Sequence, residues 1–123
     1  SVALDIKVMG VTGLAAAQAK LTYDASAVTI GDVTAGDFLQ GNTDPLFIVT
    51  KDESNGEVTI YTSSLSSDQP TSDGDGVIAT VNFTVNGSTN TNINFDSADT
   101  IMLDVNGAGI TVNGLENGYL ILE

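Results

Sequence analysis

Apolar and polar side chains alternate with a period of two residues in two short segments, and this alternation most constrains what the chain can fold into. The alternation ends at Tyr23 in residues 13–26 and begins at Val77 in residues 74–83. In the first segment, one face carries Ala15, Ala17, Ala19, Leu21 and Tyr23, and the other carries Ala16, Gln18, Lys20 and Thr22. Successive side chains of a strand point to opposite faces, so both segments are predicted to be half-buried strands despite the alanines.

Turn signals separate further short strands. Asn-Gly pairs occur five times, and this pair favours type I′ hairpin turns because both residues tolerate a positive φ. The clearest hairpin spans residues 49–60 around Asn55 and Gly56. Other strands are expected at residues 2–8, 77–85, 91–95, 101–105, 110–112 and 119–122. This spacing predicts an all-β protein, an antiparallel β-sandwich of about eight to nine strands.

Residues 1–123 are expected to form a single domain, since a chain of this length can bury a core. The first strand begins almost directly after Ser1, so we expect this module to have been excised from a larger protein. No run reaches about 18 apolar residues, which predicts no membrane insertion. The expected core is aliphatic and consists of Leu4, Ile6, Val8, Leu21, Val28, Ile30, Ile48, Val58, Ile60, Ile78, Val81, Phe83, Ile93, Phe95, Leu103 and Ile121.

Two longer loops are expected between these strands, at residues 32–45 and 63–76. Both contain glycines and one proline, which are typical of turns and loops. In the first loop, Phe38 and Leu39 are expected to act as a hydrophobic plug.

The chain is strongly acidic, with 16 acidic residues, 3 lysines and a net charge of −13. Binding to nucleic acid or to anionic lipid requires cations that neutralise phosphates, so both partners are excluded. The charge has two interpretations: solubility in a salty or extracellular medium, or attraction to a basic partner or to Ca²⁺. Many of the aspartates lie beside Gly, Asn or Ser, where Asp serves turn geometry, and this favours the first interpretation.

Cysteine and histidine are both missing from the sequence, which removes most catalytic and metal chemistry. Disulfides, thiolate metal sites and nucleophiles activated by histidine are thereby excluded. Paired carboxylates can cleave glycosides without histidine, but such an enzyme needs a cleft lined with rings that stack on sugars. The chain has three Tyr, four Phe and no Trp, and we therefore predict that it is not an enzyme.

Asp73 and Asp75 stand in an Asp-Gly-Asp-Gly run that could offer oxygen ligands to Ca²⁺. The run is not an EF-hand loop, because the Asp/Asn series does not continue and no Glu occupies the twelfth position. Turn chemistry ahead of the strand at residues 77–85 explains the same residues equally well.

Four segments together resemble the cohesin modules of bacterial and archaeal extracellular assemblies. Leu-Thr-Tyr-Asp-Ala-Ser-Ala-Val at residues 21–28 resembles the strand and corner of that family, and Gly-Val-Ile-Ala-Thr-Val-Asn-Phe at residues 76–83 resembles its later strand. Residues 33–39 and 118–122 are similar to two further family segments. The four occur in family order and at family spacing over nearly the whole chain.

This resemblance implies a jelly-roll topology and a secreted or cell-surface protein that binds a dockerin-like module. In the family one flat sheet face binds the partner, and calcium is held by the dockerin, so no cofactor is expected on this chain. The implied partner-binding residues are Ala16, Gln18, Lys20, Tyr61, Ser63 and Leu65. The period-two alternation independently places these residues on the outward side of their strands, with Val58, Ile60 and Thr62 inward.

The sequence departs from the family at Ala16 and Gln18, where well-studied cohesins carry Asn and Asp that bind a dockerin helix by hydrogen bonds. Ala16 cannot form such a bond. Two other functions therefore stay open: a carbohydrate-binding module of a secreted glycoside-degrading protein, with polysaccharide as the partner, and a structural spacer of a surface adhesin. Sugar binding usually needs a row of exposed rings, and only Tyr61, Phe38 and Tyr119 are candidates for it.

Overall fold

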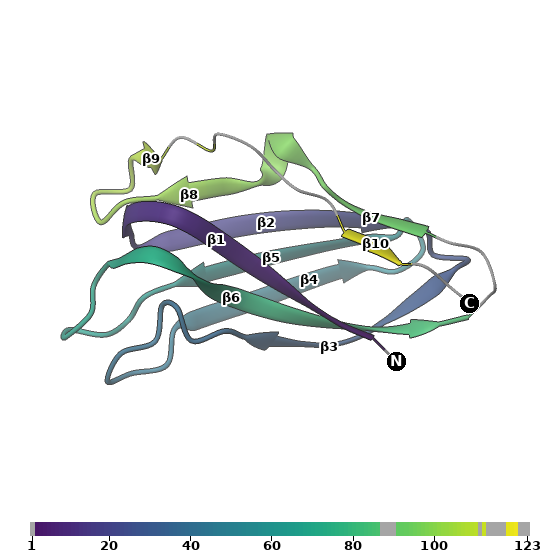
Figure 1. The fold of residues 1–123 in the computed structure, drawn as a ribbon, viewed down its shortest axis with the longest axis horizontal. Helices are drawn as coiled ribbons and strands as arrows, with labels where there is room; N and C mark the ends of the chain where they lie inside the picture. The colour runs from purple at the N-terminus through teal and green to yellow at the C-terminus, as the bar shows by residue number, and fades with distance from the viewer. Residues whose placement is uncertain (1, 87–90, 111, 113–117, 121–123) are drawn as a thin grey trace.

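The chain folds into two facing layers of antiparallel strands (Figure 1). The structure, a computed structural model, describes residues 2–86, 91–110, 112 and 118–120. The described residues contain ten extended segments, of which the shortest has two residues, and a single short 3₁₀ turn. None of them forms a helix long and apolar enough to cross a membrane.

The smaller layer is a three-stranded sheet in the order β1-β6-β3. Its strands are β1 (Val2–Leu14), β6 (Ser72–Val85) and β3 (Val28–Ala35). The pairing of β1 with β6 shifts register beyond Val8, where Gly10 and Gly13 adopt φ angles of 64° and 69°. Such left-handed angles suit glycine because it has no Cβ.

The larger layer, called the large sheet below, has the strand order β10-β7-β2-β5-β4, with β8 and β9 continuing beside β2. Its strands are β2 (Ala16–Tyr23), β4 (Leu46–Asp52), β5 (Glu57–Ser63), β7 (Thr91–Phe95), β8 (Ile101–Leu103), β9 (Gly109–Ile110) and β10 (Gly118–Leu120). A 3₁₀ turn, η1 (Ser97–Asp99), separates β7 from β8. Both of these strands pair with β2, β7 with its last residues and β8 with its first.

The core lies between the two sheets and is formed mainly by aliphatic side chains from both. The ring of Phe83 is fully buried and meets the ring of Tyr23 edge-on, with centroids 5.3 Å apart. Leu39 is buried and Phe38 packs against the core, so the predicted hydrophobic plug is confirmed. Gly76 makes room for it, because a Cβ at this position would overlap the ring of Phe38.

Most of the expected core residues are buried or pack against the core, but two predictions are wrong. Ile48 and Leu103 stand on the outward side of the large sheet, because their strands register Ile48 opposite Tyr61 and Leu103 opposite Ala16. In β8 it is the neighbouring Met102 that packs on the core. Ile121 lies outside the described residues.

The strand boundaries also differ from prediction in places. Strand β6 starts at Ser72, five residues before the expected start, because Ser72, Gly74 and Gly76 pair with β1. Asp73 and Asp75 therefore lie within the strand rather than in a loop. The hairpin of β4 and β5 is confirmed, but its turn is not of type I′. Only Gly56 has a positive φ there, of 67°, and none of the described non-glycine residues has one.

Candidate functional site

The outward side of the large sheet, called the outer face below, collects side chains from four neighbouring strands. From Ala17 onward strand β2 alternates: its inward side chains pack in the core while Gln18, Lys20 and Thr22 point outward. In β5, Val58, Ile60 and Thr62 are buried and the residues between them are partly exposed. The outer face consists of Ala16, Gln18, Lys20, Thr22, Leu46, Ile48, Thr50, Asp52, Glu57, Thr59, Tyr61, Ser63, Ile101 and Leu103.

The structure brings the six residues predicted as a site to this face or to its border. Gln18 lies directly opposite Tyr61 in the β2–β5 ladder, and Ala16 lies opposite Ser63. Lys20 follows on the same side of β2. Leu65 is two residues beyond β5, in the loop at the border of the face. That these residues bind a partner stays a prediction.

One half of the outer face is unusually apolar. Among the described residues, six large hydrophobic side chains are exposed, and five of them lie on this face or at its border. These five are between 40% and 63% exposed: Leu46, Ile48, Leu65, Ile101 and Val105. The sixth, Met9, lies on β1 in the other sheet. Exposed apolar side chains that gather on one face of a folded domain commonly mark an interaction site.

A hollow of about 420 Å³ opens at the apolar end of the face. It lies between the β8–β9 turn, which contributes Val105, and the loop after β5, which contributes Leu65. Two backbone hydrogen bonds of 2.9 Å join both walls to Ala15, from Ala15 N to Leu103 O and from Ser64 N to Ala15 O. Ala16 lines the hollow and is only 5% exposed, although it stands on the outward side of β2.

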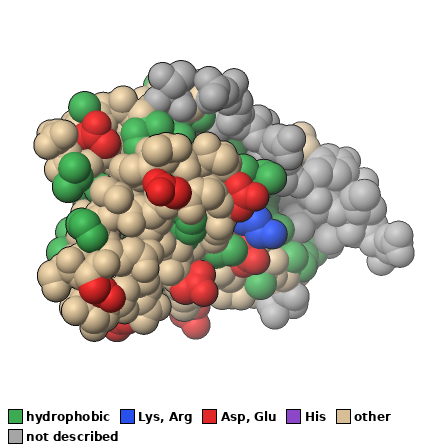
Figure 2. Space-filling model, turned by 60° about the vertical axis from the view of Figure 1, so that its left-hand side comes forward, with side chains coloured by type: hydrophobic (Ala, Val, Ile, Leu, Met, Phe, Trp, Pro, Cys, Tyr) green, Lys and Arg blue, Asp and Glu red, His purple; other side chains and the backbone are tan. Residues whose placement is uncertain are grey.

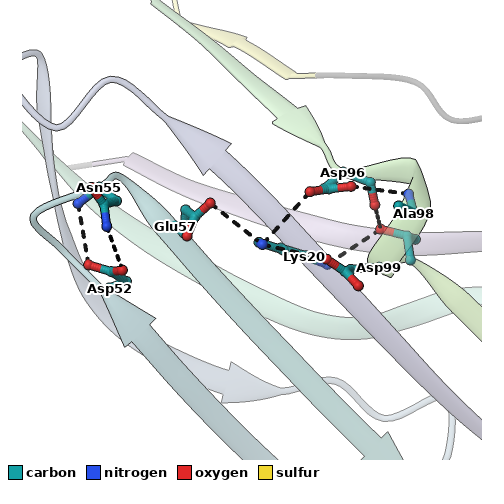
Figure 3. Close-up of polar contacts among 8 residues, drawn as sticks. Lys20, Asp52, Asn55, Glu57, Asp96, Ala98 and Asp99 are labelled. Atoms are coloured by element: carbon teal, nitrogen blue, oxygen red, sulfur yellow. Dashed lines mark hydrogen bonds and ion pairs between the residues drawn. The ribbon is translucent and has the colours of Figure 1, made fainter.

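The other half of the face is acidic and is organised around Lys20 (Figure 3). The ammonium nitrogen of Lys20 lies 3.5 Å from a carboxylate oxygen of Glu57, 3.5 Å from one of Asp99 and 3.8 Å from one of Asp96. The charge of Glu57 is the main cause that raises the pKa of Lys20 above its ordinary value. With three carboxylates around one ammonium group, this end of the face stays negative.

Two hydrogen bonds join the turn η1 and its cap residue Asp96 to strand β2. Asp96 N donates a hydrogen bond of 2.8 Å to Lys20 O, and the side-chain amide of Gln18 donates one of 3.0 Å to Asp99 O. The side chain of Asp96 caps the turn by accepting from Ala98 N. Gln18 and Lys20 are therefore held in place by the turn, which lies about 80 residues away in the sequence.

Asp73 and Asp75, the candidate calcium ligands, each accept a hydrogen bond from a glycine of β1. Asp75 Oδ1 lies 2.7 Å from Gly10 N, and Asp73 Oδ1 lies 2.6 Å from Gly13 N. The two carboxylates thus satisfy the amides that the register shifts of β1 leave outside the regular ladder. Within the described part of the chain, no group of three or more potential ligand residues is arranged so that it could hold a metal ion.

Aromatic rings are scarce on the outer face. Tyr23 and Phe83 are buried, and Phe38 and Phe47 pack against the core. Of the described aromatic side chains, only that of Tyr61 stands on this face. A row of coplanar rings, which flat polysaccharide surfaces require, is therefore not formed by the described residues.

Solved structures of cohesins share this fold. The chain superposes on CaCohA2, in a CaDoc0917–CaCohA2 complex, with a TM-score of 0.82 at 22% identity, over 99% of this chain and 89% of that one. The solution structure of CaCohA2 from Clostridium acetobutylicum gives a TM-score of 0.75 at 25% identity, over 95% of this chain and 80% of that one. The third ScaC cohesin of Acetivibrio cellulolyticus, in complex with the ScaB dockerin, gives a TM-score of 0.81 at 23% identity, over 98% of this chain and 87% of that one.

No curated protein sequence matches the chain significantly. The predicted all-β sandwich of jelly-roll type is confirmed by the superpositions, which extend over nearly the whole chain. The family model of the cohesin domain matches residues 1–118. With its fold and its sequence in agreement, this chain belongs to the cohesin domain family.

Proposed function

We propose that this chain is a non-catalytic docking module, which binds a dockerin-like protein through the outer face in an extracellular or cell-surface assembly. The single observation that carries the proposal is the gathering of exposed apolar side chains on that face, five of the six found in the described residues. Family membership supports the same conclusion, since the ScaC and scaffoldin B cohesins of Acetivibrio cellulolyticus were crystallised with dockerins.

The predicted contact residues of this docking module are Ala16, Gln18, Lys20, Tyr61, Ser63 and Leu65. We add Ile48 and Ile101 to this proposal, because they flank the Gln18–Tyr61 pair in the same row across the sheet. A paired sheet face is preformed, so binding through it costs little ordering entropy. Calcium would be held by the partner, and the module would be one part of a larger extracellular protein.

Calorimetric titration with isolated dockerins, such as the ScaB and Cel5 dockerins of Acetivibrio cellulolyticus, tests this function. Binding is expected in calcium and is expected to disappear when calcium is chelated. Ile48→Asp places a charge in the apolar half without disturbing the core, because Ile48 is 50% exposed. It should weaken binding at least about tenfold, the loss of one interface anchor.

Thr84→Asp is the matched control, because Thr84 is exposed on β6 in the opposite sheet. It should leave the affinity unchanged. A dockerin panel that shows no binding in calcium would contradict the proposed function. Equal weakening by both variants would contradict the assignment to the outer face.

A further inference from the structure

The hollow beside Ala16 has the chemistry of a socket for one protruding side chain. We propose that it receives an aliphatic side chain of the docking partner, while a neighbouring lysine or arginine of that partner meets the carboxylate of Asp104. This inference rests on the proposed function and specifies the chemistry of the partner. It also makes Ala16 a residue that determines specificity, because its small side chain leaves the hollow open.

The size and lining of the hollow support an aliphatic occupant. Its volume of about 420 Å³ exceeds that of a single side chain, so an inserted group would fit together with part of its backbone. Leu65 and Val105 stand at its two walls and are more than half exposed. Covering them with an apolar group would remove their surface from water, worth roughly 25 cal/mol for each Å² buried.

Ala16 decides what kind of group can enter. It lies opposite both Ser63 and Leu103 in the sheet and is almost fully buried beneath the two walls. The methyl group of Ala16 offers neither a hydrogen-bond donor nor an acceptor, so a polar group inserted directly beside it would have to find its partners among the serines and Asp104 elsewhere in the lining. An apolar side chain needs no such partners.

Charge complementarity favours a cation next to the inserted side chain. Asp104 lines the hollow, and its Oδ1 accepts hydrogen bonds from Asn106 N and Ala108 N. None of the described lysines forms an ion pair with it, whereas Lys20, the one cation of the outer face, is engaged by three acidic residues. Seen from the end that carries the β8–β9 hairpin, acidic side chains outnumber cationic ones beside the exposed hydrophobic groups (Figure 2).

The socket can be tested without the partner, by nuclear magnetic resonance titration with 3-methylbutylamine and with its uncharged analogue 3-methylbutanol. Both probes should perturb the backbone amides around Ala16, and the amine should bind more tightly. Ala16→Leu occupies the part of the hollow next to residue 16 and should weaken the binding of both probes at least about tenfold. Asp104→Asn keeps the oxygen that accepts from the turn, and it should abolish only the preference for the amine.

Thr59→Leu is the matched control, since Thr59 stands on the outer face away from the hollow. It should leave both probes unaffected. If Ala16→Leu does not fold, Leu65→Ser and Val105→Ser replace it, because these exposed side chains contribute little to the core. The socket proposal would be overturned if the probes perturb amides in other regions only, or if they bind the Ala16→Leu variant as tightly as the parent protein.

Titration of the same variants with the dockerin panel separates this inference from the proposed function. Dockerin binding that Ala16→Leu weakens supports both. Dockerin binding that Ala16→Leu leaves unchanged overturns the socket as a docking element and leaves the proposed function intact. Probe binding in the socket without any dockerin binding contradicts the proposed partner class, while the preference for an aliphatic cation stands.

Discussion

The backbone nitrogen of Tyr23 donates a hydrogen bond of 2.8 Å to the carbonyl oxygen of Gly56. This contact joins the end of β2 to the turn between β4 and β5, and it brings the two backbones close together. Gly56 is buried, has a φ of 67°, and a Cβ on it would overlap the carbonyl oxygen of Tyr23. The turn therefore requires glycine for two separate reasons, its backbone angle and its lack of a side chain.

Gly56→Ala is expected to destabilise the fold more than Gly107→Ala. Gly107 also has a positive φ, of 77°, but nothing lies within 4 Å of a Cβ there. Gly107→Ala should therefore cost only the left-handed backbone penalty, about 1–2 kcal/mol. Gly56→Ala should cost at least about 1 kcal/mol more, because the Tyr23 backbone must move. Urea unfolding measures the free energy of unfolding of both variants. Equal losses of stability would contradict the close approach of Gly56 to the Tyr23 backbone.

Thr62→Val is expected to stabilise the protein. The Thr62 side chain is buried between the sheets, and its hydroxyl has no hydrogen-bond partner among the described residues. An unsatisfied buried hydroxyl costs roughly 1–3 kcal/mol, and valine has nearly the same shape. The free energy of unfolding should rise by about 1 kcal/mol.

Thr59→Val on the same strand is the control, because Thr59 points to the outer face. Its effect should stay within about 0.5 kcal/mol, as for most surface changes. A loss of stability for Thr62→Val would mean that the hydroxyl is satisfied.

The alternating strands could be predicted from the sequence because their two faces differ in polarity. In β2 and β5 every second residue is buried, so Gln18 and Tyr61 could be assigned to the outside without a structure. Strand β4 begins Leu-Phe-Ile-Val, which is apolar on both sides, and β8 is Ile-Met-Leu. In such strands composition cannot decide which side faces the core, and for this reason the core predictions for Ile48 and Leu103 are wrong. A strand apolar on both sides was the signal that the outer face is itself apolar.

Other parts of the candidate site depend on contacts between distant segments. The carboxylates of η1 lie next to Lys20, although about 80 residues separate them in the sequence. The hollow beside Ala16 forms only where the loop after β5 and the β8–β9 turn meet. Neither arrangement follows from local periodicity, because both depend on which strands pair with the two halves of β2.

Two aspartates are expected to make the fold sensitive to acid. Hydrogen bonds from Ser26 lower the pKa of Asp24, and hydrogen bonds from Asn55 and Ser54 lower that of Asp52. A lowered folded-state pKa means that the unfolded chain takes up these protons first. The stabilisation is therefore complete above about pH 4 and is lost as the pH falls through the folded-state values.

Asp24→Asn and Asp52→Asn should each reduce this acid sensitivity. Urea unfolding at several pH values between about pH 5 and pH 2 measures this sensitivity, as the fall of the urea midpoint over that interval. A slope that neither Asp24→Asn nor Asp52→Asn changes would contradict the prediction.

The fold should also lose stability in alkali, through Tyr23 and Lys20. Burial, together with the nearby charges of Glu53 and Asp52, raises the pKa of Tyr23, and Glu57 is the main cause that raises the pKa of Lys20. Both groups keep their protons in the folded state at a pH where the unfolded chain releases them. Their stabilisation is therefore present below about pH 10 and is lost as the pH rises through the folded-state values.

Tyr23→Phe and Lys20→Met separate these two contributions to alkaline unfolding. Tyr23→Phe preserves the edge-on packing against Phe83 and removes the phenol, so it should flatten the decline of the urea midpoint between about pH 9 and pH 11. Lys20→Met should also flatten it, and it should lower stability at neutral pH, where three carboxylates lose their shared cation. Concentrated salt should shrink this neutral-pH loss, because salt screens partly exposed ion pairs. If the urea midpoint of a variant with both Tyr23→Phe and Lys20→Met declines in alkali as steeply as that of the parent, the prediction is contradicted.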